Sequence, residues 1–178
     1  MTLARSPVVL MLLVSSLAVA ADAGVGDRWA PIRFLVGEWT GTTEGQAGTG
    51  TVKRKYEFIL GGKFLRETNT STYPPQPKNK KGEVHEHLGI FSYDRLRQRL
   101  VLRQFHVEGF VNQYVIEPVE AGAKRFVFAS ERFENLAEGW RARESYQVIG
   151  PDEFVETFEV APPGEEFQVY SVNRFKRG

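Results

Sequence analysis

Short segments in which apolar and polar residues alternate recur from Gly37 to the end of this chain. An alternation with a period of two is typical of strands that bury one face. Clusters such as Gly61-Gly62 and Pro162-Pro163-Gly164 separate the segments, and no connection is long enough for the crossover helix that parallel strands need. We therefore predict an all-β fold, an antiparallel up-and-down barrel of about ten strands.

The turn residues divide the chain into ten expected strands. They cover roughly residues 37–43, 51–60, 63–72, 84–93, 99–107, 109–118, 124–132, 140–149, 153–160 and 166–175. Residues 28–36 precede them and are rich in apolar side chains. We expect this segment to form a short helical turn that closes one end of the barrel.

The first twenty residues have the pattern of an export signal. Arg5 precedes an apolar run, and the small residues Ala18 and Ala20 suit cleavage after Ala20. The run is shorter than the roughly 20 residues that span a bilayer. We expect residues 1–20 to be removed, residues 21–27 to form a flexible leader, and residues 28–178 to form a single domain in the periplasm or outside the cell. No membrane span is expected after removal.

Composition excludes several classes of function. The chain has 23 basic and 22 acidic residues, and losing Arg5 with the signal makes the two numbers equal. Strong attraction to nucleic acid is therefore not expected. Cysteine is absent, which excludes a thiolate ligand and a cysteine nucleophile. No nucleophile elbow, phosphate loop or dinucleotide-binding glycine pattern is present, so we predict no catalytic residue and no cofactor.

Isolated polar residues share the predicted inward strand faces with large aromatic residues. A buried charge without a partner costs several kcal/mol, so these polar residues either pair inside a filled barrel or line a cavity. We predict a cavity that holds a small, partly apolar ligand, with an acidic ligand group facing Arg132. The candidate ligand-binding residues are Asn112, Tyr114, Arg132, Glu144, Tyr146, Glu156 and Asn173.

The chain's three histidines fall on two neighbouring predicted strands. His85 and His87 are one strand period apart, and His106 lies on the next strand. If paired residues have numbers that sum to 191 or 193, all three rings share one face and could offer three imidazoles to a zinc ion. No fourth ligand is evident. We therefore predict ordinary surface or barrel-lining histidines and no metal site.

Three motifs resemble a known family. They are Gly37-Glu38-Trp39-Thr40-Gly41, Ile59-Leu60-Gly61-Gly62-Lys63-Phe64-Leu65 and Leu88-Gly89-Ile90-Phe91-Ser92-Tyr93-Asp94. Together they are similar to an uncharacterised family of lipocalin-like (calycin-type) exported bacterial β-barrels and, more distantly, to nitrobindin-like haem-binding barrels. The resemblance implies a calycin-type barrel across most of the chain.

Two alternatives to a ligand carrier remain, the first from this resemblance and the second from the inward polar residues. Nitrobindin-like barrels hold haem iron through a histidine on the last strand, whereas residues 166–175 contain none. Tyr170 could ligate iron, but we expect it to face away from Ser171 and Asn173. A haem protein or enzyme that uses the same cavity is one alternative. A structural or partner-binding barrel with a filled interior is the other.

Overall fold

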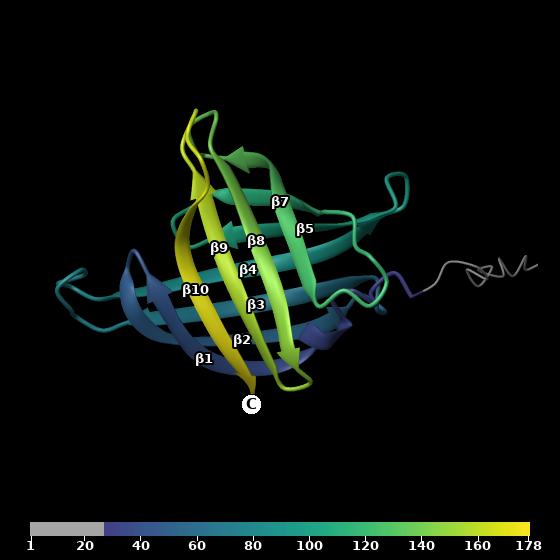
Figure 1. Ribbon diagram of the computed structural model, residues 1–178, viewed down its shortest axis with the longest axis horizontal. Coiled ribbons are helices and arrows are strands. Elements are labelled where there is room, and N and C mark those ends of the chain that lie inside the picture. The colour runs from purple at the N-terminus through teal and green to yellow at the C-terminus, as the bar shows by residue number, and fades with distance from the viewer. Residues whose placement is uncertain (1–26) are drawn as a thin grey trace, which may run out of the picture.

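Ten antiparallel strands close into a barrel in the computed structural model, which describes residues 27–178 (Figure 1). Each strand pairs with the next along the chain, and the first strand pairs with the last. The predicted lipocalin-like up-and-down barrel is confirmed. The strands are β1 (Gly37–Gly45), β2 (Gly48–Ile59), β3 (Phe64–Tyr73), β4 (Glu83–Asp94), β5 (Arg99–His106), β6 (Val111–Ile116), β7 (Arg125–Glu134), β8 (Arg141–Gly150), β9 (Glu153–Ala161) and β10 (Gln168–Arg177).

The expected signal, residues 1–20, lies outside the described residues, as does the expected leader except for Asp27. The helical turn expected before the first strand is present as the 3₁₀ helix η1 (Arg33–Leu35). Trp29, Ile32 and Leu35 are at most 4% exposed and join the apolar core. The Trp39 indole donates a hydrogen bond to the Leu35 carbonyl at 2.6 Å, which ties this turn to β1.

The barrel interior has an apolar end and a polar end. In an up-and-down barrel the odd-numbered strands run one way and the even-numbered strands run back. Apolar side chains occupy the inward positions near the starts of the odd strands and the ends of the even strands, beside η1. Toward the other end, many of the inward positions of the same strands are polar, although Ala142, Phe158 and Val160 are apolar. The core at the apolar end includes Leu35, Trp39, Tyr56, Leu65, Phe91, Leu102, Tyr114, Phe128, Tyr146, Phe154 and Phe175.

Three strand pairs contain a register shift, and the two at Glu131 and Tyr170 change which side chains point into the cavity. Between β6 and β7, Gln113 pairs with Arg132 but Tyr114 pairs with Ser130, which leaves Glu131 as an extra residue. Between β9 and β10, the register shifts in the same way at Tyr170. A bulge inserts one residue into one strand and therefore reverses the alternation beyond it. Both bulges lie toward the polar end.

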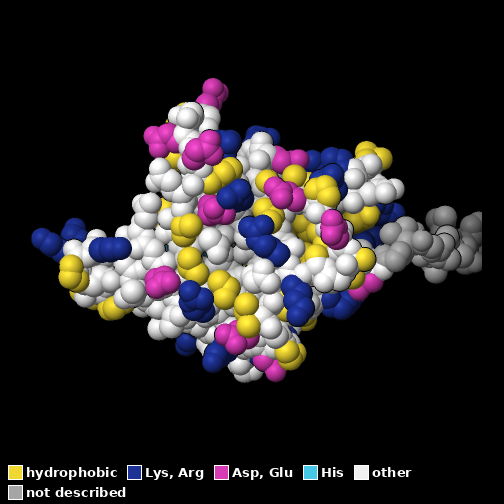
Figure 2. Space-filling model, in the orientation of Figure 1, with side chains coloured by type: hydrophobic (Ala, Val, Ile, Leu, Met, Phe, Trp, Pro, Cys, Tyr) yellow, Lys and Arg dark blue, Asp and Glu magenta, His cyan; other side chains and the backbone are white. Residues whose placement is uncertain are grey.

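The surface carries both signs of charge. Basic and acidic side chains are interspersed on the face drawn in Figure 2, apart from a lysine group at the tip of the β3–β4 loop, which contains Lys78, Lys80 and Lys81. Gln76 in that loop accepts a hydrogen bond from the backbone of Thr49 at 2.9 Å and so joins the loop to the β1–β2 hairpin. None of the helical segments in residues 27–178 has the length and hydropathy needed to cross a bilayer.

The aromatic packing at the apolar end predicts a large cost for truncating Phe154. This ring is fully buried, stacks on Phe175 at 4.6 Å and meets the edge of Trp39 at 4.7 Å. We expect Phe154→Ala to lower the free energy of unfolding in urea by about 3–5 kcal/mol, because it leaves a cavity among rigid rings. The control is Leu96→Ala, at a residue that is 98% exposed, with an expected change within about 0.5 kcal/mol. Equal costs for the two variants would contradict this packing.

Candidate functional site

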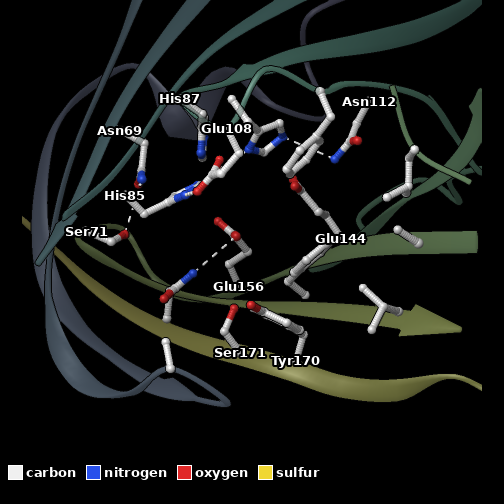
Figure 3. Close-up of a pocket in the computed structure, with 18 of the residues that line it drawn as sticks. Asn69, Ser71, His85, His87, Glu108, Asn112, Glu144, Glu156, Tyr170 and Ser171 are labelled. Carbon is white, nitrogen blue, oxygen red and sulfur yellow. Dashed lines mark hydrogen bonds and ion pairs between the residues drawn. The ribbon is translucent and has the colours of Figure 1, made fainter. Parts of the chain in front are cut away.

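The polar end of the barrel encloses a cavity of about 350 Å³ (Figure 3). Its floor is made of buried polar side chains from six strands, and aromatic side chains form its rim. Figure 3 shows His85, His87 and Glu108 gathered on one wall, with Glu156 and Ser171 across the cavity. The floor includes Arg54, Asn69, Ser71, Asn112, Glu144, Glu156, Ser171 and Asn173. The rim includes Tyr73, Phe110, Phe133, Trp140, Phe158 and Tyr170.

Arg54 on β2 is the centre of the floor. It is 4% exposed, and its guanidinium forms ion pairs with Glu156 and, at 3.1 Å, with Glu67. Arg54 Nε also donates to Asn69 Oδ1 at 3.0 Å, and the Phe175 ring lies 4.7 Å below the guanidinium. One buried cation thus holds two buried carboxylates. The ion pairs offset the several kcal/mol that each buried charge would otherwise cost.

Glu67 connects Arg54 to the histidine wall. Its carboxylate lies 3.0 Å from His87 Nε2. Burial alone would raise the pKa of Glu67, but the charges of Arg54 and His87 outweigh it and hold that pKa at about 2. The glycine opposite Glu67 on β4, Gly89, provides the necessary room. A Cβ atom at Gly89 would lie 2.5 Å from Glu67 Oε2.

Glu144 on β8 has a different protonation state. Burial, reinforced by the negative charges of Glu156 and Glu67, raises the pKa of Glu144 to about 8. No cation lies within ion-pairing distance of Glu144 among the described residues, and its Oε2 accepts a hydrogen bond from the Tyr146 hydroxyl at 2.7 Å. Near neutral pH Glu144 is therefore a carboxylic acid beside the ion pairs of Arg54.

The three histidines share one wall. His87 pairs with His106, so the residue numbers sum to 193 and the condition for three inward rings is met. The ring centroids lie 5.2 to 5.7 Å apart, and one nitrogen from each ring lies within 4.8 Å of the others. Burial and the neighbouring rings of His87 and His85 lower the pKa of His106 to about 3, so this ring is neutral at physiological pH.

Four of the predicted ligand-binding residues line the cavity, namely Asn112, Glu144, Glu156 and Asn173. Two others, Tyr114 and Tyr146, are fully buried beneath the floor, where their hydroxyls hydrogen-bond to floor residues. Tyr114 accepts from Asn112 Nδ2 at 2.8 Å, and Tyr146 donates to Glu144 as described above. The two tyrosines support the cavity from below.

Arg132 was predicted to line the cavity, and this prediction is wrong. Its side chain is 70% exposed and lies 3.6 Å from Glu134 on the outside of the barrel. The bulge at Glu131 is the physical reason, since it reverses the alternation and turns Phe133 inward in place of Arg132. No ligand group inside the cavity can face Arg132.

Tyr170 was expected to face away from the cavity side, and this too is corrected. It is the extra residue of the second bulge, its side chain lies at the cavity rim, and its ring meets Phe158 at 5.6 Å (Figure 3). Arg54 and Glu67 were not among the site residues predicted from the sequence. Arg54 lies between Val52 and Tyr56 in an inward alternation, and that pattern could have revealed it. Glu67 gives no such local signal, because its environment is built by β2 and β4.

No protein-family model and no curated protein matches this sequence. Among solved structures, the crystal structure of Rv2717c from M. tuberculosis is similar, with a TM-score of 0.64 and 16% identity over 86% of this chain and 99% of that chain. A de novo designed fluorescence-activating β-barrel matches with a TM-score of 0.31 and 14% identity, over 86% of this chain and 100% of the design. The likeness to Rv2717c shows the barrel fold alone.

The raised pKa of Glu144 predicts that stability falls as the pH rises. Because the folded pKa of about 8 lies above the ordinary value of 4.5, protonated Glu144 contributes fully below about pH 4.5, and this contribution is lost as the pH rises through 8. Glu144→Gln keeps the neutral shape and does not titrate. We expect the stability of the wild type relative to this variant to fall by on the order of 3 kcal/mol between pH 5 and 9 in urea unfolding. Glu138→Gln, at an exposed residue, is the control; parallel pH curves for wild type and Glu144→Gln would contradict the assignment.

The close approach of Gly89 to Glu67 predicts that this position rejects a side chain. We expect Gly89→Ala to lower the free energy of unfolding by about 1–3 kcal/mol, because the added methyl group displaces a carboxylate that is fixed by Arg54 and His87. The matched control is Gly150→Ala, also in a strand, where an added Cβ meets nothing within 4 Å. Equal effects of the two substitutions in urea unfolding would show that Glu67 has room to move.

Proposed function

We propose that this chain is exported and that its barrel binds a small, partly apolar molecule in the cavity at its polar end. The observation that carries the proposal is the combination of a buried polar floor with an aromatic rim around about 350 Å³ of space. Binding sites for small molecules typically have apolar walls and a few placed polar groups. Export is supported by the basic start, apolar run and small residues of positions 1–20.

The charges of the floor indicate the chemical class of the ligand. Arg54 is the buried cation, and it is already paired with Glu67 and Glu156. The charge of Arg54 is therefore not free for a ligand, while Glu144 adds a neutral acid below about pH 8. An anionic ligand would be repelled by the carboxylates, whereas a neutral or cationic ligand with hydrogen-bond donors would be attracted. A neutral or cationic ligand is therefore proposed in place of the ligand with an acidic group that was predicted from the sequence.

The residues present do not fit haem in the way that the nitrobindin resemblance implies. That resemblance calls for a histidine on the last strand, and β10 has none. The histidines that line the cavity lie on β4 and β5. Tyr170 stands at the rim, where its ring packs against Phe158. We therefore assign no role to haem. The filled-interior alternative applies to the apolar end of the barrel only.

Native mass spectrometry of the exported protein tests the proposal directly. The protein is purified from the export compartment without stripping, and its mass is compared with that of the same sample after denaturation. We expect a polypeptide that begins at Ala21, together with a defined extra mass that is lost on denaturation. A polypeptide that still begins at Met1 would contradict export, independently of any ligand.

Fluorescent probes test the cavity and its charge preference. We expect the uncharged probe N-phenyl-1-naphthylamine to bind with enhanced fluorescence, and its anionic relative 1-anilinonaphthalene-8-sulfonate to bind at least about tenfold more weakly, a difference of about 1.4 kcal/mol. Ser171→Phe would fill the cavity, because Ser171 lines it, and we expect it to weaken the neutral probe by at least about tenfold.

The matched control for Ser171→Phe is Val169→Phe. Val169 is on the same strand but on the other side of the bulge, and it is 53% exposed. We expect it to leave probe affinity unchanged within about twofold. Equal affinities of Ser171→Phe, Val169→Phe and wild type would show that the probe binds outside the barrel and would contradict the proposed site.

A further inference from the structure

The histidine wall places all of the chain's imidazoles on one side of the cavity. The sequence contains three histidines, and all three line the cavity. His85 and His87 come from alternate positions of β4, and His106 comes from β5 directly opposite His87. Three histidines that converge from two adjacent strands onto a cavity form a ligand set suited to zinc, copper, cobalt or nickel.

The spacing of the ring nitrogens fits a metal ion. His85 Nε2 and His106 Nδ1 lie 3.4 Å apart. In a tetrahedral site with metal–nitrogen bonds of about 2.0–2.1 Å, ligand nitrogens lie about 3.3 Å apart. The third ring, His87, offers a nitrogen within 4.8 Å of the other two, and this ring would move toward them to complete the set. We propose that His85, His87 and His106 bind one divalent transition-metal ion, zinc first, on the wall of the barrel cavity.

Acceptors stand behind the rings, as expected around metal-bound histidines. Such histidines usually pass their second N–H to a carboxylate or carbonyl, which orients the ring. Glu108 Oε1 lies 2.8 Å from His85 Nδ1 and takes this role, leaving Nε2 for the metal. Glu67 Oε1 lies 3.0 Å from His87 Nε2. These two carboxylates also supply negative charge beside the ion.

Asn112 completes the surroundings of His106. Its amide nitrogen lies 3.1 Å from His106 Nε2, while its buried Oδ1 has no hydrogen-bond partner among the described residues. A half-turn of the amide would place Oδ1 opposite His106 Nε2. In that position Oδ1 accepts a hydrogen bond from His106 Nε2–H, and His106 Nδ1, the nitrogen facing His85, is free to bind the ion. The half-turn gives the unpartnered oxygen a donor but ends the donation of Nδ2 to the Tyr114 hydroxyl, which can then turn and donate to Oδ1.

The charge of the floor also favours a cation. When His87 is neutral, as a metal ligand must be, the charges of Glu67 and Glu156 together exceed the single charge of Arg54. A divalent ion at the histidine wall would offset this excess in a site where water screens charge poorly. Three protein ligands leave one position of a tetrahedral site open, and because the histidines line the cavity, that position faces the enclosed space. A small molecule with a lone pair can occupy it.

Metal titration of the untagged full chain, expressed in a host that exports it, tests the proposal. A polyhistidine tag would mask the result because the chain has only three histidines of its own. We expect zinc to compete at one equivalent per chain against a chromophoric chelator, and cobalt to give the intense visible absorption of a four-coordinate ion. Absence of saturable zinc binding, or a stoichiometry well above one, would overturn the proposal.

Substitutions assign the ligands. We expect His87→Gln and His106→Gln each to lower the affinity for zinc by at least about 100-fold. Loss of a residue that only hydrogen-bonds to a metal-bound histidine already lowers metal affinity by about 10–100-fold. Glu108→Gln should weaken it by about tenfold through His85. Glu86→Gln is the matched control on the same strand, where the exposed carboxylate lies between the two histidines in sequence, and it should leave affinity unchanged. Wild-type affinity in both histidine variants would overturn the assignment.

Two further readouts are needed. Thermal melting and circular dichroism distinguish loss of metal binding from loss of the fold, and probe binding distinguishes the metal site from the proposed small-molecule site. Zinc should raise the melting temperature of the wild type by several degrees but not that of His106→Gln, while the far-ultraviolet circular dichroism of the two metal-free proteins should match. N-phenyl-1-naphthylamine binding is measured on the same metal-free samples. Probe binding without zinc binding would overturn only the metal site, and zinc binding without probe binding would overturn only the small-molecule site.

Discussion

The ion pairs of Arg54 determine how the interior of this barrel is divided. Its guanidinium joins β2 to Glu67 on β3 and to Glu156 on β9, and Phe175 of β10 lies beneath it. Removing Arg54 would leave buried carboxylates without their cation, at a cost of about 3–5 kcal/mol. Apolar rings pack on one side of this cluster, and the cavity lies on the other. The cluster therefore holds the strands together and also closes the bottom of the site.

The direction of the strands explains why one end can be filled and the other hollow. Successive strands alternate in direction, so the apolar half of each inward face comes first in odd strands and last in even strands. This pattern puts Trp39, Phe91 and Phe154 at the same level although they are far apart in the sequence. The two halves meet at Tyr114 and Tyr146, whose hydroxyls hydrogen-bond to Asn112 and Glu144 of the polar half.

The sequence allowed the strands, the turns and the closing helical turn to be predicted, because period-two alternation and glycine clusters are local signals. It also gave the condition on strand register, paired residue numbers that sum to 191 or 193, under which His87 and His106 share a face. Arg132 was misplaced because one inserted residue, Glu131, reverses a strand face and leaves no local mark in the alternation. Glu67 was missed because its state depends on Arg54, His87 and Gly89, which come from other strands. Residues fixed by long-range pairing are those that local patterns cannot assign.

The pairing of β1 with β10 has a consequence for the order in which this chain can fold. Trp39 pairs with Arg177, and Gly178 donates a backbone hydrogen bond to the Glu38 carbonyl at 2.9 Å. The pairing of β1 on this side therefore forms only when β10 is present. Contacts so distant in sequence are slow to form, because the chain must lose the entropy of a long loop before the favourable contacts between its ends can form. A nascent chain can add hairpins one by one, yet the free edge of β1 stays unpaired until β10 has been made. The ring thus closes only after β10 is available, and an exposed strand edge is a site for pairing with another chain until then.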